Sequence, residues 1–211
     1  MYEVTGAGGM NVAILGSTRG TDLQAIIDAI ENKILRGINI SFVLSEKEDA
    51  YILERARKHN LAAIFLDSEG KTREEFDDEV DELLKEHGVE LVLLIGYMKM
   101  MGKKFVSKWG NKTMNIHPSL LPGFAGGMDL KIHQAVLDRG CKFSGCTLMF
   151  IDEGKDTGPI IMQKVVEVTD KETANSLKEK VQKAEQELFL KAIPLYVRGK
   201  IVLEGTKVIV K

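Results

Sequence analysis

Asn115 and His117 stand two residues apart in the stretch MNIHPSLLP, which follows an apolar run. If Met114–His117 ends a β-strand, successive side chains alternate in direction, so Asn115 and His117 project from the same face. Pro118 disfavours a helical conformation at His117 and keeps the strand extended up to the imidazole. An amide and an imidazole on one face can serve a reaction, but the stretch can equally be a plain strand end before a proline-rich turn.

A polar loop with a second candidate group, DEGKDTGP, lies between two apolar runs further along the chain. Asp156 in this loop has two interpretations that the residues alone leave open. Most aspartates in an Asp-x-Gly-Pro pattern form turns. Asp156 can instead face His117, where a carboxylate favours the charged imidazolium and fixes the orientation of the ring.

A candidate phosphate site lies in the stretch GSTRGTD, Gly16–Asp22, which follows the first apolar run and opens a helical pattern. Backbone N–H groups at a helix start, beside Gly20 and the positive end of the helix dipole, suit a phosphate group. Arg19 can add a charge-assisted contact. The stretch matches neither a dinucleotide-binding fingerprint nor a Walker P-loop. It can also be a capped helix start, with Thr21 or Asp22 as the N-cap.

Alternating strand and helix patterns must position these residues. The alternation is strict through residue 117, which predicts a parallel sheet with helices on both faces. Ligands bind beyond the carboxyl ends of such strands, where Gly16–Asp22, Gly96–Met101 and Asn115–Pro122 all fall. The helix after the first strand is expected to bury one apolar stripe, made of Leu23, Ile26, Ile27, Ile30 and Ile34.

The pattern changes after residue 117. Gly123–Met128 is glycine-rich and is expected to be a mobile loop, while residues 145–153 and 158–169 are expected to add antiparallel strands to the sheet. A long helix and a closing hairpin follow. We predict an α/β fold with a mostly parallel twisted sheet, in a single domain over residues 1–211, of which 1–9 form an N-terminal extension.

Composition argues against several classes of protein. Lys and Arg number 29 against 31 Asp and Glu, a net charge of -2, so a general nucleic-acid surface is not expected. The longest apolar run, Leu91–Met98, is too short to cross a membrane, and the N-terminus lacks the pattern of a secretory signal. The two cysteines and four histidines show no metal-ligand spacing. We expect a cytoplasmic monomer or homodimer without a metal.

Four motifs, in order along the chain, resemble the glycinamide ribonucleotide formyltransferase family: MNVAIL…GTDLQAIIDAI, LIGYMKMM, MNIHPSLLP and DTGPIIMQ. The similarity runs from about Met10 to the end of the chain. The combination of NIHPSLLP with D-x-G-P is specific to the wider folate-dependent formyltransferase group, and this chain leaves no room for the extra C-terminal domain of its methionyl-tRNA and sugar-nucleotide members. The resemblance implies the formyltransferase fold, two small-molecule partners and one reaction. A formyl group passes from 10-formyltetrahydrofolate to the amine of glycinamide ribonucleotide, in purine biosynthesis.

The resemblance also implies roles for the three candidate groups. Asn115, His117 and Asp156 match the family's catalytic asparagine, histidine and aspartate. The amine attacks the formyl carbon directly, and negative charge develops on the formyl oxygen. Asn115 and a protonated His117 would stabilise that oxygen, at on the order of 3 kcal/mol for a well-aimed donor. Asp156 would keep His117 charged and help to remove the proton of the amine.

Two binding regions follow from the same resemblance. For the acceptor, the backbone of residues 20–22 would hold the phosphate and Glu185 the ribose hydroxyls; the expected substrate-binding residues are Arg19, Gly20, Thr21, Asp22, Gly96, Met98 and Glu185. The expected walls of the folate pocket are Met98, Lys99, Met100, Met101, Val106, Asp152 and Lys155. Without the resemblance, a methionine cluster more often belongs to a core and a glutamate to a solvated helix face.

The phosphate loop departs from the family's pattern. It has TRGTD, Thr18–Asp22, where Gly-Asn-Gly-Ser-Asn is usual, and this puts the Asp22 carboxylate near a phosphate dianion. Either Asp22 caps the helix and turns away, with Arg19 offsetting its charge, or the acceptor is another amine, such as an amino-sugar nucleotide. Hydrolysis of 10-formyltetrahydrofolate and a non-catalytic nucleotide-binding domain are the remaining alternatives.

Overall fold

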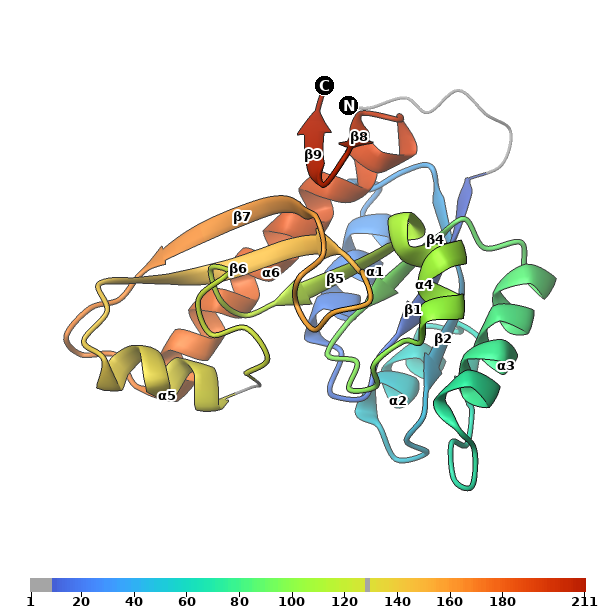
Figure 1. Cartoon of the computed structure of the whole chain (residues 1–211), viewed down its shortest axis with the longest axis horizontal. Coiled ribbons are helices and arrows are strands. Elements are labelled where there is room, and N and C mark those ends of the chain that lie inside the picture. The colour runs from blue at the N-terminus through green and yellow to red at the C-terminus, as the bar shows by residue number, and fades with distance from the viewer. Residues whose placement is uncertain (1–8, 128–129) are drawn as a thin grey trace.

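The computed structural model describes residues 9–127 and 130–211 (Figure 1). In these ranges the elements are β1 Met10–Leu15, α1 Thr21–Glu31, β2 Ile38–Ser45, α2 Tyr51–Lys58, β3 Ala63–Phe65, α3 Arg73–Glu86, β4 Leu91–Leu94, α4 Lys103–Trp109, the 3-10 turn η1 Gly110–Lys112, β5 Thr113–His117, α5 Leu130–Asp138, β6 Phe143–Phe150, β7 Ile160–Glu167, α6 Ala174–Val197, β8 Ile201–Glu204 and β9 Lys207–Val210. Most of the predicted N-terminal extension and Met128 of the predicted mobile loop lie outside the described residues. No helix within the described ranges is long and apolar enough to cross a membrane.

One sheet holds seven strands in the order β3-β2-β1-β4-β5-β6-β7. The strands from β1 to β5 pair in parallel, whereas β6 and β7 are antiparallel additions. The prediction of an α/β fold with a mostly parallel sheet and antiparallel C-terminal strands is therefore confirmed, and β8 and β9 form the expected hairpin. The strand order reverses at β1, which lies between β2 and β4. Such a reversal opens a crevice at the carboxyl ends of the two strands beside it.

The two faces of the sheet bury different cores because side chains alternate along each strand. Val12 and Ile14 of β1 belong to the cluster that contains residues of α1, α2, α5 and α6. Ala13 and Leu15, the intervening residues, pack with α3 and α4 on the opposite face. Helices thus cover both faces (Figure 1), which explains why β4 and the buried residues 12–15 of β1 are all apolar.

The first helix is shorter than its hydrophobic pattern predicts. Helix α1 ends at Glu31, and Lys33 then takes a left-handed φ of 59°. The N–H groups of Ile34 and Leu35 both donate to the carbonyl of Ala29, which closes the helix end. Ile34 is consequently 72% exposed and Leu35 is buried in its place. The expectation that Ile34 belongs to the buried stripe is wrong.

Two aspartates of α3 anchor helix α4. The backbone N–H of Gly102 donates to Asp77 Oδ2 at 2.6 Å, just before α4 begins. Trp109 Nε1, at the last residue of α4, donates to Asp81 Oδ1 at 2.9 Å. Because both ends of α4 are held, the segment 98–101 that precedes it runs between two fixed points, the end of β4 and the start of α4.

Candidate functional site

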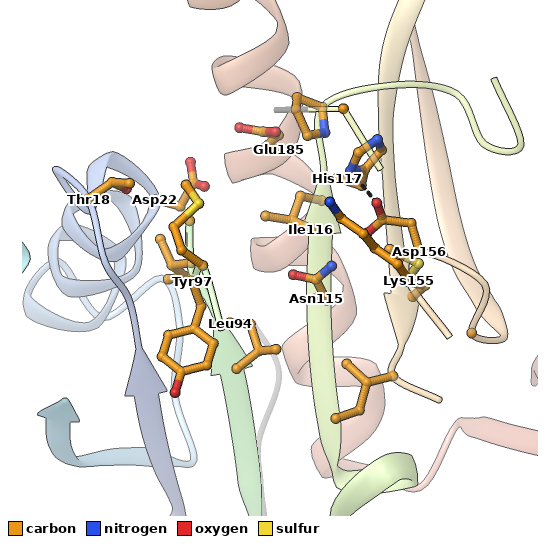
Figure 2. Close-up of a pocket in the computed structure, with 18 of the residues that line it drawn as sticks. Thr18, Asp22, Leu94, Tyr97, Asn115, Ile116, His117, Lys155, Asp156 and Glu185 are labelled. Atoms are coloured by element: carbon orange, nitrogen blue, oxygen red, sulfur yellow. Dashed lines mark ion pairs between the residues drawn. The ribbon is translucent and has the colours of Figure 1, made fainter. Parts of the chain in front are cut away.

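A cavity of about 420 Å³ opens at the carboxyl ends of β1, β4 and β5. It lies at the point where the strand order reverses, as expected for a ligand site in an open α/β sheet. Its walls come from the loops after β1 and β4, the end of β5, the loop between β6 and β7, and one side of α6 (Figure 2). All three stretches expected at this edge contribute to it.

The structure brings nearly all of the expected site residues to this one cavity. Those that line it are Arg19, Gly20, Thr21, Asp22, Gly96, Met98, Lys99, Met100, Met101, Asn115, His117, Asp152, Lys155, Asp156 and Glu185. Val106 is the exception. It lies on α4, packs against the core shared with α3, and borders a separate depression.

His117 and Asp156 face each other at the end of β5. His117 is 4% exposed; its ring Nδ1 lies 3.4 Å from Asp156 Oδ2, and its Nε2 lies 3.1 Å from the carbonyl oxygen of Phe124. A carboxylate oxygen and a carbonyl oxygen thus face the two ring nitrogens, and both oxygens are hydrogen-bond acceptors. The same Asp156 oxygen accepts the N–H of Gly126 at 2.8 Å. Asp156 also has a φ of 57°, so it forms a turn and faces the imidazole at once.

Asn115 lies on the same strand as His117 and lines the same cavity. It pairs with Leu94 of β4 on one side and with Met149 of β6 on the other. A strand that is hydrogen-bonded on both edges holds its Cα atoms in place. The backbone position from which the Asn115 side chain projects is therefore fixed. Figure 2 shows it further down β5 than the His117 ring.

The loops after β1 and β4 are joined by a buried serine. Ser17 Oγ accepts the N–H of Met98 at 2.9 Å and donates to Glu46 Oε2 at 2.9 Å. Sequence reasoning missed both Ser17 and Glu46. Each follows closely on the end of a parallel strand, β1 and β2, and that position could have drawn attention to them.

Gly96 lets the same two loops approach closely. Its φ is 59°, in the left-handed region that favours glycine, and a Cβ on it would lie 2.3 Å from Thr18 Oγ1. A larger residue would push the loop after β4 away from the loop after β1. Gly96 therefore sets the width of the cavity at the reversal point.

The start of α1 is open in the way that an anion site requires. Gly20, at φ 65°, is the N-cap, and among the described residues no side chain is seen to cap the first N–H groups of the helix. The expectation that Thr21 or Asp22 is the N-cap is therefore wrong. The guanidinium of Arg19 lies 5.9 Å from the ring centroid of Tyr51, on the exposed side of the loop.

Asp22 neither caps α1 nor turns away from the cavity. Its side chain is buried, with 5% of the residue exposed, and Oδ1 has no hydrogen-bond partner among the described residues. Burial raises the pKa of Asp22 to about 7, although a hydrogen bond with Gln186 opposes the shift. Glu185, 6% exposed, has a pKa well above its usual value because of burial and then the charge of Asp22, while Lys178 acts in the opposite direction.

Helix α6 presents a polar face to the cavity. Lys178, Gln182 and Glu185 all line it, at the spacing that places residues on one side of a helix. Lys178 and Gln182 were not expected from the sequence. Helical spacing counted back from Glu185 would have indicated them.

Fold and site together define an α/β protein with a small-molecule cavity at the reversal point of a mostly parallel sheet. A model of the formyl transferase family matches residues 10–193, and the chain belongs to this family. Phosphoribosylglycinamide formyltransferase of Escherichia coli is 34% identical over 91% of this chain and 89% of that protein.

The structure is also similar to solved structures over nearly its whole length. Glycinamide ribonucleotide transformylase 1 from Symbiobacterium toebii matches with a TM-score of 0.90 and 35% identity, over 99% of this chain and 97% of that chain. A longer relative, the trifunctional purine biosynthetic protein adenosine-3 of Chironomus tentans, is 39% identical over 91% of this chain. The chain spans 14% of the length of that relative.

Proposed function

We propose that this protein transfers the formyl group of 10-formyltetrahydrofolate to the primary amine of glycinamide ribonucleotide, as a cytoplasmic enzyme of purine biosynthesis. The observation that carries the proposal is one cavity that joins the uncapped start of α1 to Asn115 and the His117–Asp156 pair. Relatives named phosphoribosylglycinamide formyltransferase that match about nine tenths of this chain support it.

The acceptor would extend along the cavity from α1 to β5. Its phosphate would accept hydrogen bonds from the backbone N–H groups of residues 20–22, and its ribose would face Glu185. The glycinamide arm would then pass Gly96 and Met98. The folate would occupy the side formed by residues 98–101 and the loop 152–156, so that its formyl group meets the amine beside Asn115 and His117.

The reaction would proceed by direct attack. The amine nitrogen forms a bond to the formyl carbon, and the carbonyl electrons move to oxygen. The amide of Asn115 and the imidazolium of His117 stabilise this oxyanion, and His117 exchanges its Phe124 carbonyl partner for it. Asp156 keeps His117 oriented and helps to accept the amine proton, and the intermediate collapses when N10 of tetrahydrofolate leaves and is protonated.

Steady-state turnover with and without the acceptor tests the proposal. Adding glycinamide ribonucleotide should accelerate loss of the formyl group from 10-formyltetrahydrofolate and yield formylglycinamide ribonucleotide. His117→Ala should abolish most of this gain. Turnover that does not rise above background hydrolysis when the acceptor is added would rule out the proposed reaction.

A further inference from the structure

Two buried carboxyl groups face the cavity from different helices (Figure 2). Asp22 is the second residue of α1, and Glu185 lies in the middle of α6. Asp22 Oδ1 is buried without a hydrogen-bond partner in the described part of the chain. A buried carboxylate oxygen in this state is unfavourable unless a ligand donates to it or the group carries a proton.

Charged and titratable groups from several elements surround this pair in the described part of the chain. Lys178 of α6 and Cys146 of β6 act on or respond to the pair, and Lys164 of β7 lies near Cys146. His133 of α5 and Arg19 of the loop after β1 line the same cavity. Lys178 lowers the pKa of Glu185 but does not outweigh burial and the charge of Asp22. Burial, and then the charges of Glu185 and Asp22, raise the pKa of the Cys146 thiol, so it stays neutral. Each acid therefore disfavours ionisation of the other, and burial raises the pKa of both, so ionisation of the second carboxyl is the harder step.

We propose that Asp22 is a specificity-determining residue, whose carboxyl binds the ribose hydroxyls of the acceptor together with Glu185 while the pair shares a single negative charge. A singly charged pair offers both a donor and acceptors to hydroxyl groups, each of which can donate and accept. It also places less negative charge near a phosphate at the start of α1. This inference rests on the proposed function, which supplies a phosphorylated riboside as the ligand.

The coupling predicts that acceptor binding takes up a proton at alkaline pH. At pH values above the pKa of the second carboxyl, the pair must take up one proton before the ligand binds. The Kd for the acceptor should therefore rise about tenfold per pH unit in this range. Calorimetric titration of the full chain with glycinamide ribonucleotide, in buffers of different ionisation enthalpy from pH 6 to 8.5, counts these protons. Asp22→Asn, which cannot titrate, should lose this uptake and flatten the pH profile. Asp28→Asn, an exposed carboxylate on the same helix, should behave as the unaltered protein does.

The ribose is tested separately with the 2′-deoxy analogue of the acceptor. The unaltered protein should prefer the ribose form by about tenfold or more, and Asp22→Asn should narrow the preference.

The inference is overturned if the unaltered protein and Asp22→Asn show the same proton uptake. Should Asp22→Asn fail to fold, zero uptake by the unaltered protein, after the ligand's own ionisation is subtracted, overturns it alone. Formyl transfer together with binding that takes up no proton would rule out this inference and leave the proposed function intact. Proton-linked binding without formyl transfer would rule out the proposed function. If the protein does not bind the acceptor at all, both are ruled out.

Discussion

At the residue scale, the same side chain acquires different properties from what it faces. Burial acts to raise the pKa of Asp81, but hydrogen bonds from Lys108, Lys85 and Trp109 outweigh it and hold that pKa far below its usual value. Asp22, which lacks such donors at Oδ1, has its pKa raised to about 7. Asp156 faces an imidazole and a backbone N–H. Only the last arrangement suits a carboxylate that works with a histidine in catalysis.

Replacement of Asp156 by Asn tests the role of the carboxylate beside His117. The amide keeps the size of the side chain but cannot favour a charged imidazolium, so kcat should fall by about 10²–10⁴-fold while KM for the acceptor changes little. Steady-state kinetics measures both. Glu153→Gln, an exposed carboxylate in the same loop, is the matched control. An unchanged kcat in Asp156→Asn would remove Asp156 from the mechanism.

Replacement of Ser17 by Ala tests the link between the loops after β1 and β4. The N–H of Met98 would lose its partner, and the oxygen of Glu46 would lose a donor. An unmade buried hydrogen bond costs about 1–3 kcal/mol, so we expect a lower Tm and a higher KM for both substrates. Ser107→Ala, at an exposed serine, is the control and should keep the Tm and the KM values of the unaltered protein. Thermal unfolding and steady-state kinetics measure these quantities. Equal behaviour of the two variants would contradict this role.

At the element scale, the turn between β6 and β7 determines where Asp156 lies. A Cβ on Gly158 would lie 1.9 Å from the carbonyl oxygen of Phe150, and the N–H of Phe150 donates to the carbonyl of Pro159 at 2.9 Å. The glycine and proline of the D-x-G-P pattern therefore pack the turn against the end of β6. The aspartate of the same pattern reaches His117 from this packed base.

Gly158→Ala should disturb both stability and catalysis. The backbone must move to admit the methyl group, at about 2–3 kcal/mol, and a displaced Asp156 should lower kcat/KM by on the order of a hundredfold. Gly140→Ala is the control: its Cβ has open space and only its φ of 63° is unfavourable, at about 1–2 kcal/mol. Urea unfolding and kinetics provide the readouts. A Gly158→Ala variant that loses no more activity than Gly140→Ala would argue against the turn as the support of Asp156.

At the scale of the whole molecule, the cavity exists only because distant elements meet. Helices α1 and α6 both pack on the face of the sheet that holds Val12 and Ile14, and this brings Asp22 and Glu185 to one site. Two buried acids are a cost to the fold, since burial disfavours their charged forms. The protein keeps them at the expense of stability, as functional sites often do.

The pH dependence of stability should reveal this cost. An aspartate in the unfolded chain has an ordinary pKa of 3.8, whereas burial raises the pKa of Asp22 to about 7, so the folded protein binds more protons than the unfolded chain between these pH values. The free energy of unfolding should therefore fall as pH rises from about 4 to about 7, by at most ~4 kcal/mol from this group. Asp22→Asn should remove that fall, so the free energy of unfolding of the variant, relative to that of the unaltered protein, should be higher at pH 8 than at pH 4. Urea unfolding at both pH values measures this difference. An equal difference at the two pH values would contradict a raised pKa of Asp22.

Local sequence was sufficient for much of this architecture. The alternation of apolar runs and helical patterns predicted the parallel strands and their helices, because periodicity reflects burial of one face or stripe. The spacing of Asn115 and His117 placed them on one strand, and carboxyl-end positions placed the three stretches at one edge of the sheet. The resemblance supplied Glu185, which no local pattern distinguishes from a solvated residue.

The tertiary structure decided what each of these groups faces. Helix α1 ends before Ile34 because the N–H groups of Ile34 and Leu35 donate to the carbonyl of Ala29. The spacing of hydrophobic residues does not predict these hydrogen bonds. Asp22 became a buried acid because α6, far along the chain, packs against α1, and Gln186 of α6 hydrogen-bonds with the Asp22 side chain. Burial and electrostatic coupling arise between residues distant in sequence. They depend on packing in three dimensions, whereas periodicity and turn preferences depend on residues that are close together in the sequence.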